Sequence, residues 1–185
     1  MKRSILLTAL LAISLNASAD VKPFVTLEVD HEGVHSGNDN NSLNVIPGIK
    51  LDNITVDVKG QVSRQDETKN ISTAFEPRIK YDLPVGYGLT AWARVGLGEK
   101  LNSGDAFGYY TIEPGVTYQY SKEVTLSISD KYRDSFATGK DYQTNTVYAG
   151  GSYTLGATDT IAAKLYRKYN DTESTGVEVA YTHWF

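Results

Sequence analysis

The sequence predicts an all-β protein: a closed antiparallel transmembrane β-barrel of about ten strands, with eight or twelve strands as alternatives. Three observations support this prediction. Segments of alternating apolar and polar residues recur along the chain, the connections between them alternate in length, and the chain ends on the aromatic residue Phe185. Successive side chains of a strand point to opposite faces, so such segments indicate a sheet with one apolar and one polar face.

The start of the chain has the parts of a secretory signal peptide over residues 1–19, which leaves residues 20–185 as the predicted barrel domain. A basic start is followed by an apolar run over residues 5–15 and by the small residues Ala17 and Ala19. This order is typical of a cleaved signal peptide. The apolar run is shorter than the roughly 20 residues that a membrane-spanning helix needs. We therefore expect export and removal of this segment.

The composition excludes several classes of function. Net charge is −4 for the whole chain, and removal of the two basic residues of the signal segment makes the mature chain more acidic still. Such a chain has no overall basic field to attract nucleic acid. Cysteine is absent, so neither a disulfide framework nor a thiolate metal site is expected. The mean hydropathy of −0.33 is compatible with a barrel, because only alternate residues face lipid.

The alternating segments give the expected strands in chain order. We expect strands at residues 25–30, 43–51, 54–63, 71–81, 89–97, 109–120, from 124 onward, 144–155, 161–169 and 175–185. Residues typical of turns and loops, such as Gly, Asn and Asp, fill the gaps. Long polar connections follow odd segments and short ones follow even segments, which predicts longer extracellular loops and short periplasmic turns. A two-sheet sandwich would explain the strand spacing but not this alternation.

A weak internal repeat marks the second, fourth and sixth segments. Its copies are residues 45–52, 75–82 and 112–119. One repeat unit is therefore a hairpin. Each copy contains a proline, at Pro47, Pro77 or Pro114, and proline removes a hydrogen bond from the ladder between strands. We expect a bulge or a ladder defect at each.

Two short motifs in these copies resemble a known family. Glu76-Pro77 and Glu113-Pro114 lie in descending strands, and a tyrosine follows each of these prolines at the fourth position. Both features are similar to segments of the oligogalacturonate-specific porin family. The resemblance implies a monomeric barrel of about twelve strands that passes acidic oligosaccharides. The present chain shows two strands fewer.

The last segment resembles the closing strand of a bacterial outer-membrane barrel. Tyr181, His183 and Phe185 share one face of it. In such barrels the carboxy-terminal aromatic residue is read by the barrel-insertion machinery, so the resemblance implies that this machinery is a partner. It also implies the outer membrane of a Gram-negative bacterium as the location, with membrane lipid and lipopolysaccharide as surroundings.

Aromatic residues at the strand ends predict two girdles on the lipid-facing surface. The periplasmic girdle would contain Tyr81, Tyr118, Tyr120, Tyr153, Tyr181 and Phe185. The outer girdle would contain Tyr132, Phe136, Tyr142 and Tyr169. Asp130 falls on the lipid-facing parity, which predicts a bulge that shifts the register there.

The opposite parity would line the lumen, and its charged side chains are the candidate solute pathway. The cations are Lys50, Lys59, Arg78, Lys80, Arg94, Lys131, Arg133, Lys164 and Lys168. The carboxylates are Glu28, Asp30, Asp57, Glu76, Glu113 and Glu178. Two interpretations stay open: an ion-pair network that fills a narrow barrel, and an anion pathway along a basic wall. That wall would be formed by Lys131, Arg133, Lys164 and Lys168.

We predict a porin-like channel for small anionic solutes such as acidic oligosaccharides. The first alternative is a non-conducting barrel that acts through its extracellular loops, in adhesion or as a surface receptor. The second is a lipid-modifying enzyme, for which the candidates are His31 and His35 of the first loop, beside Glu32, Ser36 and Asp39. No motif of such enzyme families surrounds these residues. We expect no catalysis, metal or cofactor, and a monomeric barrel.

Overall fold

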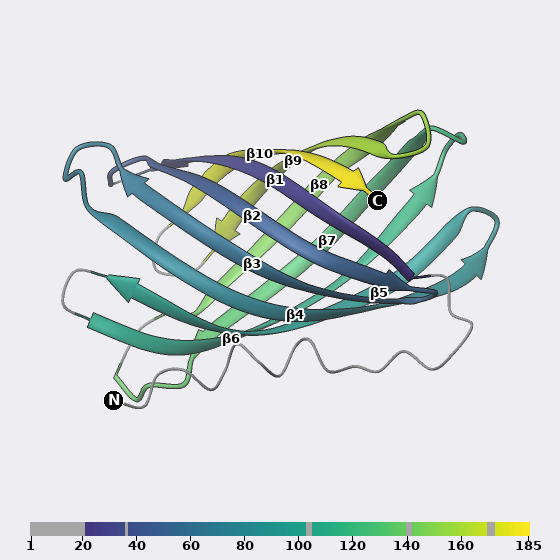
Figure 1. The fold of residues 1–185 in the computed structure, drawn as a ribbon. Helices are drawn as coiled ribbons and strands as arrows, with labels where there is room; N and C mark the ends of the chain where they lie inside the picture. Colours follow the sequence, from purple (N-terminus) through teal and green to yellow (C-terminus); the bar gives the residue numbers. More distant parts are fainter. Residues whose placement is uncertain (1–20, 36, 103–104, 140–141, 170–172) are drawn as a thin grey trace.

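The computed structural model describes residues 21–35, 37–102, 105–139, 142–169 and 173–185. These residues form one antiparallel sheet that closes into a barrel of ten strands, β1 to β10 (Figure 1). Each strand pairs with its sequence neighbours, and β1 closes the sheet by pairing with β10. Closure satisfies the backbone without leaving an edge, as a membrane requires. The predicted signal peptide lies outside the described residues.

The strand count confirms the predicted architecture of about ten strands. The strands are β1 Val21–Val34, β2 Asn40–Leu51, β3 Ile54–Gln65, β4 Ile71–Gly86, β5 Leu89–Asn102, β6 Asp105–Gln119, β7 Val124–Ser135, β8 Thr144–Leu155, β9 Asp159–Tyr169 and β10 Ser174–Trp184. No helix among the described residues has the length and apolar character needed to cross a membrane.

The connections divide the barrel into two ends. At the end that we name the loop end, they span residues 35–39, 66–70, 103–104, 136–143 and 170–173. At the other, the turn end, they span residues 52–53, 87–88, 120–123 and 156–158. The expected loop between the strands at residues 89–97 and 109–120 is wrong, because β5 and β6 continue pairing up to Asn102 and Asp105. At the turn end, Gly88 has a φ of +78°, which glycine adopts without steric cost and which fits a tight hairpin.

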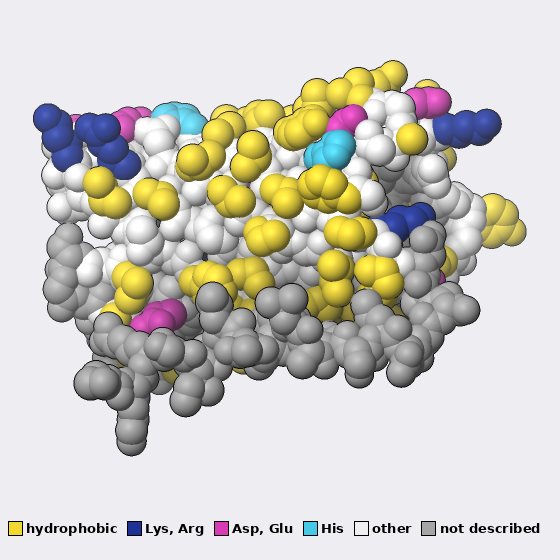
Figure 2. Space-filling view, in the orientation of Figure 1, with side chains coloured by type: hydrophobic (Ala, Val, Ile, Leu, Met, Phe, Trp, Pro, Cys, Tyr) yellow, Lys and Arg dark blue, Asp and Glu magenta, His cyan; other side chains and the backbone are white. Residues whose placement is uncertain are grey.

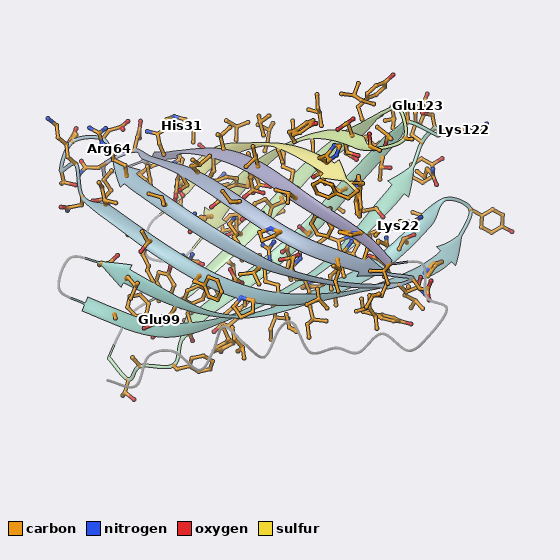
Figure 3. All side chains as sticks on the ribbon, viewed as in Figure 1. Lys22, His31, Arg64, Glu99, Lys122 and Glu123 are labelled. Carbon is orange, nitrogen blue, oxygen red and sulfur yellow. The ribbon has the colours of Figure 1, made fainter. Side chains whose placement is uncertain are left out.

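The outer surface of the barrel is apolar, and the lumen is polar. Leu27, Val45 and Ile79 are among the large apolar side chains that are exposed on the outer surface, and Figure 2 shows such side chains spread over the visible face. In Figure 3 the labelled His31 and Arg64 lie toward the loop end. This arrangement inverts that of a soluble protein and is the one expected for a barrel in lipid.

The three prolines of the repeat, Pro47, Pro77 and Pro114, interrupt the ladder without shifting it. Beside Pro47, pairing of β2 with β3 stops after Val45↔Gly60 and resumes in the same register at Gly48↔Asp57. The same gap appears beside Pro77 toward β5 and beside Pro114 toward β7. The expected ladder defect is therefore present and the bulge is not. The missing proline N–H explains the gap, since a bulge would require an extra residue on one strand.

The predicted bulge at Asp130 is also wrong. The pairing of β7 with β8 runs without a shift through Asp130↔Val147, and Asp130 is exposed on the outer surface of the barrel. It lies across from the ladder gap beside Pro114. A single carboxyl group is tolerated there because Asp and Glu cost less than Lys or Arg on the lipid-facing side of a barrel.

Candidate solute pathway

Two cavities occupy the lumen, one above the other. The upper cavity, toward the loop end, has a volume of about 670 Å³. The lower cavity, toward the turn end, has a volume of about 300 Å³. Lys59, Lys131, Tyr148 and Glu178 line both cavities, and we call this shared belt the neck. Any solute that crosses the barrel through these cavities has to pass these four side chains.

Buried ion pairs dominate the lower cavity. Arg78 Nε lies 2.6 Å from Asp57 Oδ1, and the two side chains are only 7% and 4% exposed. Lys59 Nζ lies 2.8 Å from Glu28 Oε1. Asp57 and Arg78 face each other directly across β3 and β4, so the strand register itself brings the opposite charges together. These cations are held by a carboxylate within the protein and are therefore largely neutralised.

Two further pairs follow the same rule. Lys164 contacts Glu178 at 2.6 Å across β9 and β10, and Arg94 contacts Glu113 at 3.3 Å across β5 and β6. Other pairs form between residues that do not face each other: Asp82 accepts a hydrogen bond from Lys50 at 3.2 Å and lies 2.7 Å from Lys80 Nζ. Lys168 is paired with Glu32. Asp82 and Glu32 were not among the predicted lumen carboxylates, although Glu32 continues the alternation of β1.

Three lumen cations form no ion pair with any carboxylate that the structure describes. They are Lys100 of β5 and Lys131 and Arg133 of β7, and we call them the free cations. All three line the upper cavity. Glu76 and Glu113 attract Lys131 only over a longer range; Glu76 instead accepts hydrogen bonds from Thr111 and Tyr109. The upper wall therefore presents positive charge that is available to a mobile anion.

Sequence reasoning missed Lys100. The predicted strand ended at residue 97, so Lys100 was placed in a polar loop, whereas β5 continues to Asn102. The signal was present, because the even positions from Trp92 to Lys100 continue one parity. Extending the predicted strand from residue 97 to residue 100, with the same alternation, would have placed Lys100 on the lumen wall.

Tyr142 lies inside the mouth of the barrel, so its predicted place in the outer girdle is wrong. Its ring lies 3.9 Å from Arg133 Cζ and 5.0 Å from Lys100 Nζ. The rings of Phe107 and Tyr109 meet it edge-on, at centroid distances of 4.8 and 5.5 Å. Burial raises the pKa of Tyr142, so its phenol stays neutral. The residue precedes β8, where no alternation exists to fix the direction of a side chain.

The structure places all the predicted pathway cations on the lumen side but divides them by partner. The paired ones are Lys59, Arg78, Lys80, Arg94, Lys164 and Lys168. Lys131 and Arg133 have no such pair, so the predicted basic wall of β7 and β9 contains two free and two paired cations. The predicted carboxylates Glu28, Asp57, Glu113 and Glu178 hold cations, whereas Glu76 bonds to neutral hydroxyls.

The predicted insertion signal forms one cluster on the outer surface at the turn end. Tyr181 Oη donates to Asp159 Oδ1 at 2.6 Å, and His183 Nδ1 lies 2.8 Å from the same oxygen. The ring of His183 meets that of Phe185 edge-on at 4.7 Å. Asp159 was not anticipated from the sequence. Recognition of this segment by the insertion machinery stays a prediction.

The histidines considered for catalysis, His31 and His35, lie at the loop end. His31 Nδ1 lies 2.9 Å from Asn41 Oδ1, and Ser36 lies outside the described residues. No group of three or more His, Cys, Asp or Glu side chains in the described ranges could hold a metal ion.

No protein-family model and no curated protein sequence matches the chain. Solved structures match it in fold. The β domain of a Bordetella autotransporter has a TM-score of 0.56 at 8% identity, covering 88% of this chain and 98% of that one. The COG4313 outer-membrane channel from Pseudomonas putida F1 has a TM-score of 0.52 at 11% identity, covering 93% and 97%. The KdgM porin in complex with oligogalacturonate has a TM-score of 0.49 at 12% identity, covering 86% and 99%.

Identities this low show the fold alone. The structures that are similar to this chain include outer-membrane barrels, and the present barrel has the closed antiparallel architecture expected of that class. The resemblance to small bacterial outer-membrane barrels that the sequence indicated is therefore confirmed at the level of fold.

Proposed function

We propose that the protein is a narrow outer-membrane channel for small anionic solutes. The observation that supports this most directly is the position of the free cations Lys100, Lys131 and Arg133 along one wall of the upper cavity. A cation already paired with a carboxylate adds little to the field felt by a solute, whereas an unpaired one attracts a mobile anion. The free cations would therefore make the pathway selective for anions.

The residues that line the two cavities also carry more positive than negative charge. Together, the linings of the two cavities hold ten Lys or Arg and seven Asp or Glu residues. Rings and walls of one charge set ion preference in channels. An excess of cationic side chains in a low-dielectric lumen favours both the entry and the passage of anions.

The neck limits the solute to small species. The pairs Lys59–Glu28 and Lys164–Glu178 meet there with Tyr148 and Lys131. A barrel of this size lies between side-chain-filled small barrels and open porins. We propose small organic and inorganic anions as the solutes, with acidic sugars among them. Each of them would meet Lys131, the free cation of the neck, where the two cavities join.

The proposed location follows from the same features. The protein would be exported through residues 1–19 and inserted by the barrel machinery through Tyr181, His183 and Phe185. It would act as a monomer among membrane lipid and lipopolysaccharide. The apolar outer surface and closed sheet support a place in lipid.

Reversal potentials in planar bilayers under a KCl gradient test the proposal. We expect the wild-type barrel to prefer chloride, and the variant K100Q/K131Q/R133Q to lose most of that preference. The matched control K164Q/E178Q removes a cation and its partner together, so the net charge is unchanged and the preference should persist. A silent bilayer, or a wild-type preference for potassium, would overturn the proposal.

A further inference from the structure

We propose that the mouth of the lumen contains a binding slot for aromatic carboxylates, in which the ring of Tyr142 occupies the position of the ligand's ring. The inference rests on the proposed function, because it assumes that solutes enter the barrel through this mouth. Its geometry is separate, because it concerns Tyr142 and its ring contacts rather than the neck.

Aromatic side chains of β6 shape the slot. Phe107 and Tyr109 both point into the lumen and meet the Tyr142 ring edge-on, at interplanar angles of 82° and 65°. Edge-to-face contacts are a favoured arrangement of aromatic rings. Tyr109 lies against β5 because Gly98 has no side chain there: a Cβ at Gly98 would lie 2.2 Å from Tyr109 Cζ. The slot is thus lined by two rings of β6, and Gly98 of β5 leaves the space that one of them occupies.

Two of the free cations border the slot. Arg133 Cζ and Lys100 Nζ lie 3.9 and 5.0 Å from the centre of the Tyr142 ring. Arg133 Nε is buried and has no hydrogen-bond partner among the described residues. Glu32 acts on Lys100 only over a longer range and is itself paired with Lys168. Among the residues that the structure describes, the π face of Tyr142 is thus the group with negative character that both cations contact.

An aromatic carboxylate satisfies both halves of this arrangement. Its ring would make the edge contacts with Phe107 and Tyr109 that the ring of Tyr142 makes. Its carboxylate would supply Arg133 and Lys100 with the charge-assisted hydrogen bonds that a tyrosine ring lacks, and the planar guanidinium matches a carboxylate in two parallel bonds. An aliphatic carboxylate would satisfy only the cations, and a neutral aromatic ring would satisfy only the slot.

The surroundings leave room for this exchange. Tyr142 lies outside the strands, between β7 and β8, so displacing its side chain breaks no ladder hydrogen bond. The slot opens onto the upper cavity of about 670 Å³, so substituents on the ring of the ligand are accommodated. Because Tyr142 competes for the slot, its removal should strengthen binding.

Binding of benzoate to the refolded full chain in detergent, measured by calorimetry, tests the inference. We expect Y142A to bind benzoate about tenfold more tightly than the wild type, since two cation–π contacts no longer compete. R133Q should weaken binding about tenfold. Y169A, which removes an exposed tyrosine of the outer surface near the same end, is the matched control and should bind like the wild type.

Two further ligands separate the parts of the slot. Cyclohexanecarboxylate has the charge without the aromatic ring, and benzyl alcohol has the ring without the charge; both should bind Y142A at least fivefold more weakly than benzoate. Equal affinities for benzoate and cyclohexanecarboxylate, or no gain in Y142A, would overturn the inference. Heat-modified gel mobility checks the folding of each variant, and Y142L replaces Y142A if the latter fails to fold.

The outcome is distinguishable from that of the channel experiment. Chloride-selective conduction without discrimination between the two carboxylates leaves the proposed function standing and removes the slot. Selective benzoate binding by a barrel that is silent in the bilayer supports the slot and removes the channel.

Discussion

The lower and upper halves of the lumen contain the same kinds of side chains but use them differently. In the lower half a carboxylate directly opposes a cation across the ladder, as Asp57 does Arg78. In the upper half the free cations oppose neutral residues: Arg133 faces Thr111 on one side and Thr144 on the other, and Lys100 faces Phe107. The difference therefore arises from strand register and not from composition.

The surroundings of Glu113 show how a local interruption of the ladder can separate a paired cation from a free one. It stands between Arg94 of β5 and Lys131 of β7, and it contacts Arg94 at 3.3 Å. The backbone pairing of β6 with β7 is interrupted beside Pro114, between the pairs Ile112↔Tyr132 and Gly115↔Ser129. Lys131 is thus left without an ion pair next to a carboxylate that is already in use. Paired charges stabilise the wall, whereas unpaired charges remain available to a solute.

The largest expected effect comes from breaking a pair in the lower half. Asp57→Asn leaves the Arg78 guanidinium, only 7% exposed, without its carboxylate. Removing one partner of a buried pair costs about 3 kcal/mol or more. We expect a loss of that size in the free energy of unfolding, measured by urea titration of tryptophan fluorescence in lipid vesicles.

The double variant D57N/R78Q is its control. Replacing both partners leaves no uncompensated buried charge, so a substantial part of the loss should be recovered. A loss below about 1 kcal/mol in D57N would show that water in the lower cavity solvates Arg78, and the contrast between the halves would then disappear.

The sequence predicts most of this fold because alternation is a local signal. Val25, Leu27 and Val29 identify the outer face of β1 without any knowledge of its neighbours. Strand ends are less predictable: the polar residues of the β5–β6 hairpin look like a loop, although they continue the alternation. Side chains in connections, such as Tyr142, have no period to orient them.

The division of the site into paired and free cations could not be predicted from one strand at a time. It depends on which residue stands opposite, and hence on the register of every hairpin. The Lys164–Glu178 contact needs the register of β9 against β10. To predict that Lys131 forms no ion pair with a described residue, one would also need to know of the gap in pairing beside Pro114. Composition predicts the excess of cations but not their positions.

A smaller effect is expected from Glu178→Gln, which would turn a paired cation into a free one. Lys164 would lose its contact at 2.6 Å, but its side chain is already 32% exposed, so water compensates in part. We expect a loss of about 1 kcal/mol in unfolding free energy. Chloride preference should rise relative to the wild type, as read from the reversal potential. An unchanged preference would mean that pairing does not determine which cations a solute senses.

The opposite change is to give a free cation a partner. Thr144 faces Arg133 across β7 and β8, so Thr144→Glu should imitate the lower half within the upper cavity. The new pair lies near the open mouth, where a salt bridge contributes less than about 1 kcal/mol. Stability should barely change, while chloride preference falls. Thr144→Gln keeps the size without the charge, and it should retain the preference; a fall in both variants would indicate obstruction instead.

The smallest effect is expected from salt, which acts on the two halves differently. Raising KCl from about 0.1 M to about 1 M shortens the Debye length from about 10 Å to about 3 Å. A free cation attracts a distant anion over several ångströms of water, so this screening should reduce chloride preference. The Asp57–Arg78 contact spans 2.6 Å and is shielded from solvent, so the destabilisation by D57N should be nearly the same at both concentrations. A stability loss that shrank with salt as much as the preference did would mean that mobile ions reach both halves alike, and that position in the barrel, not pairing, is what distinguishes them.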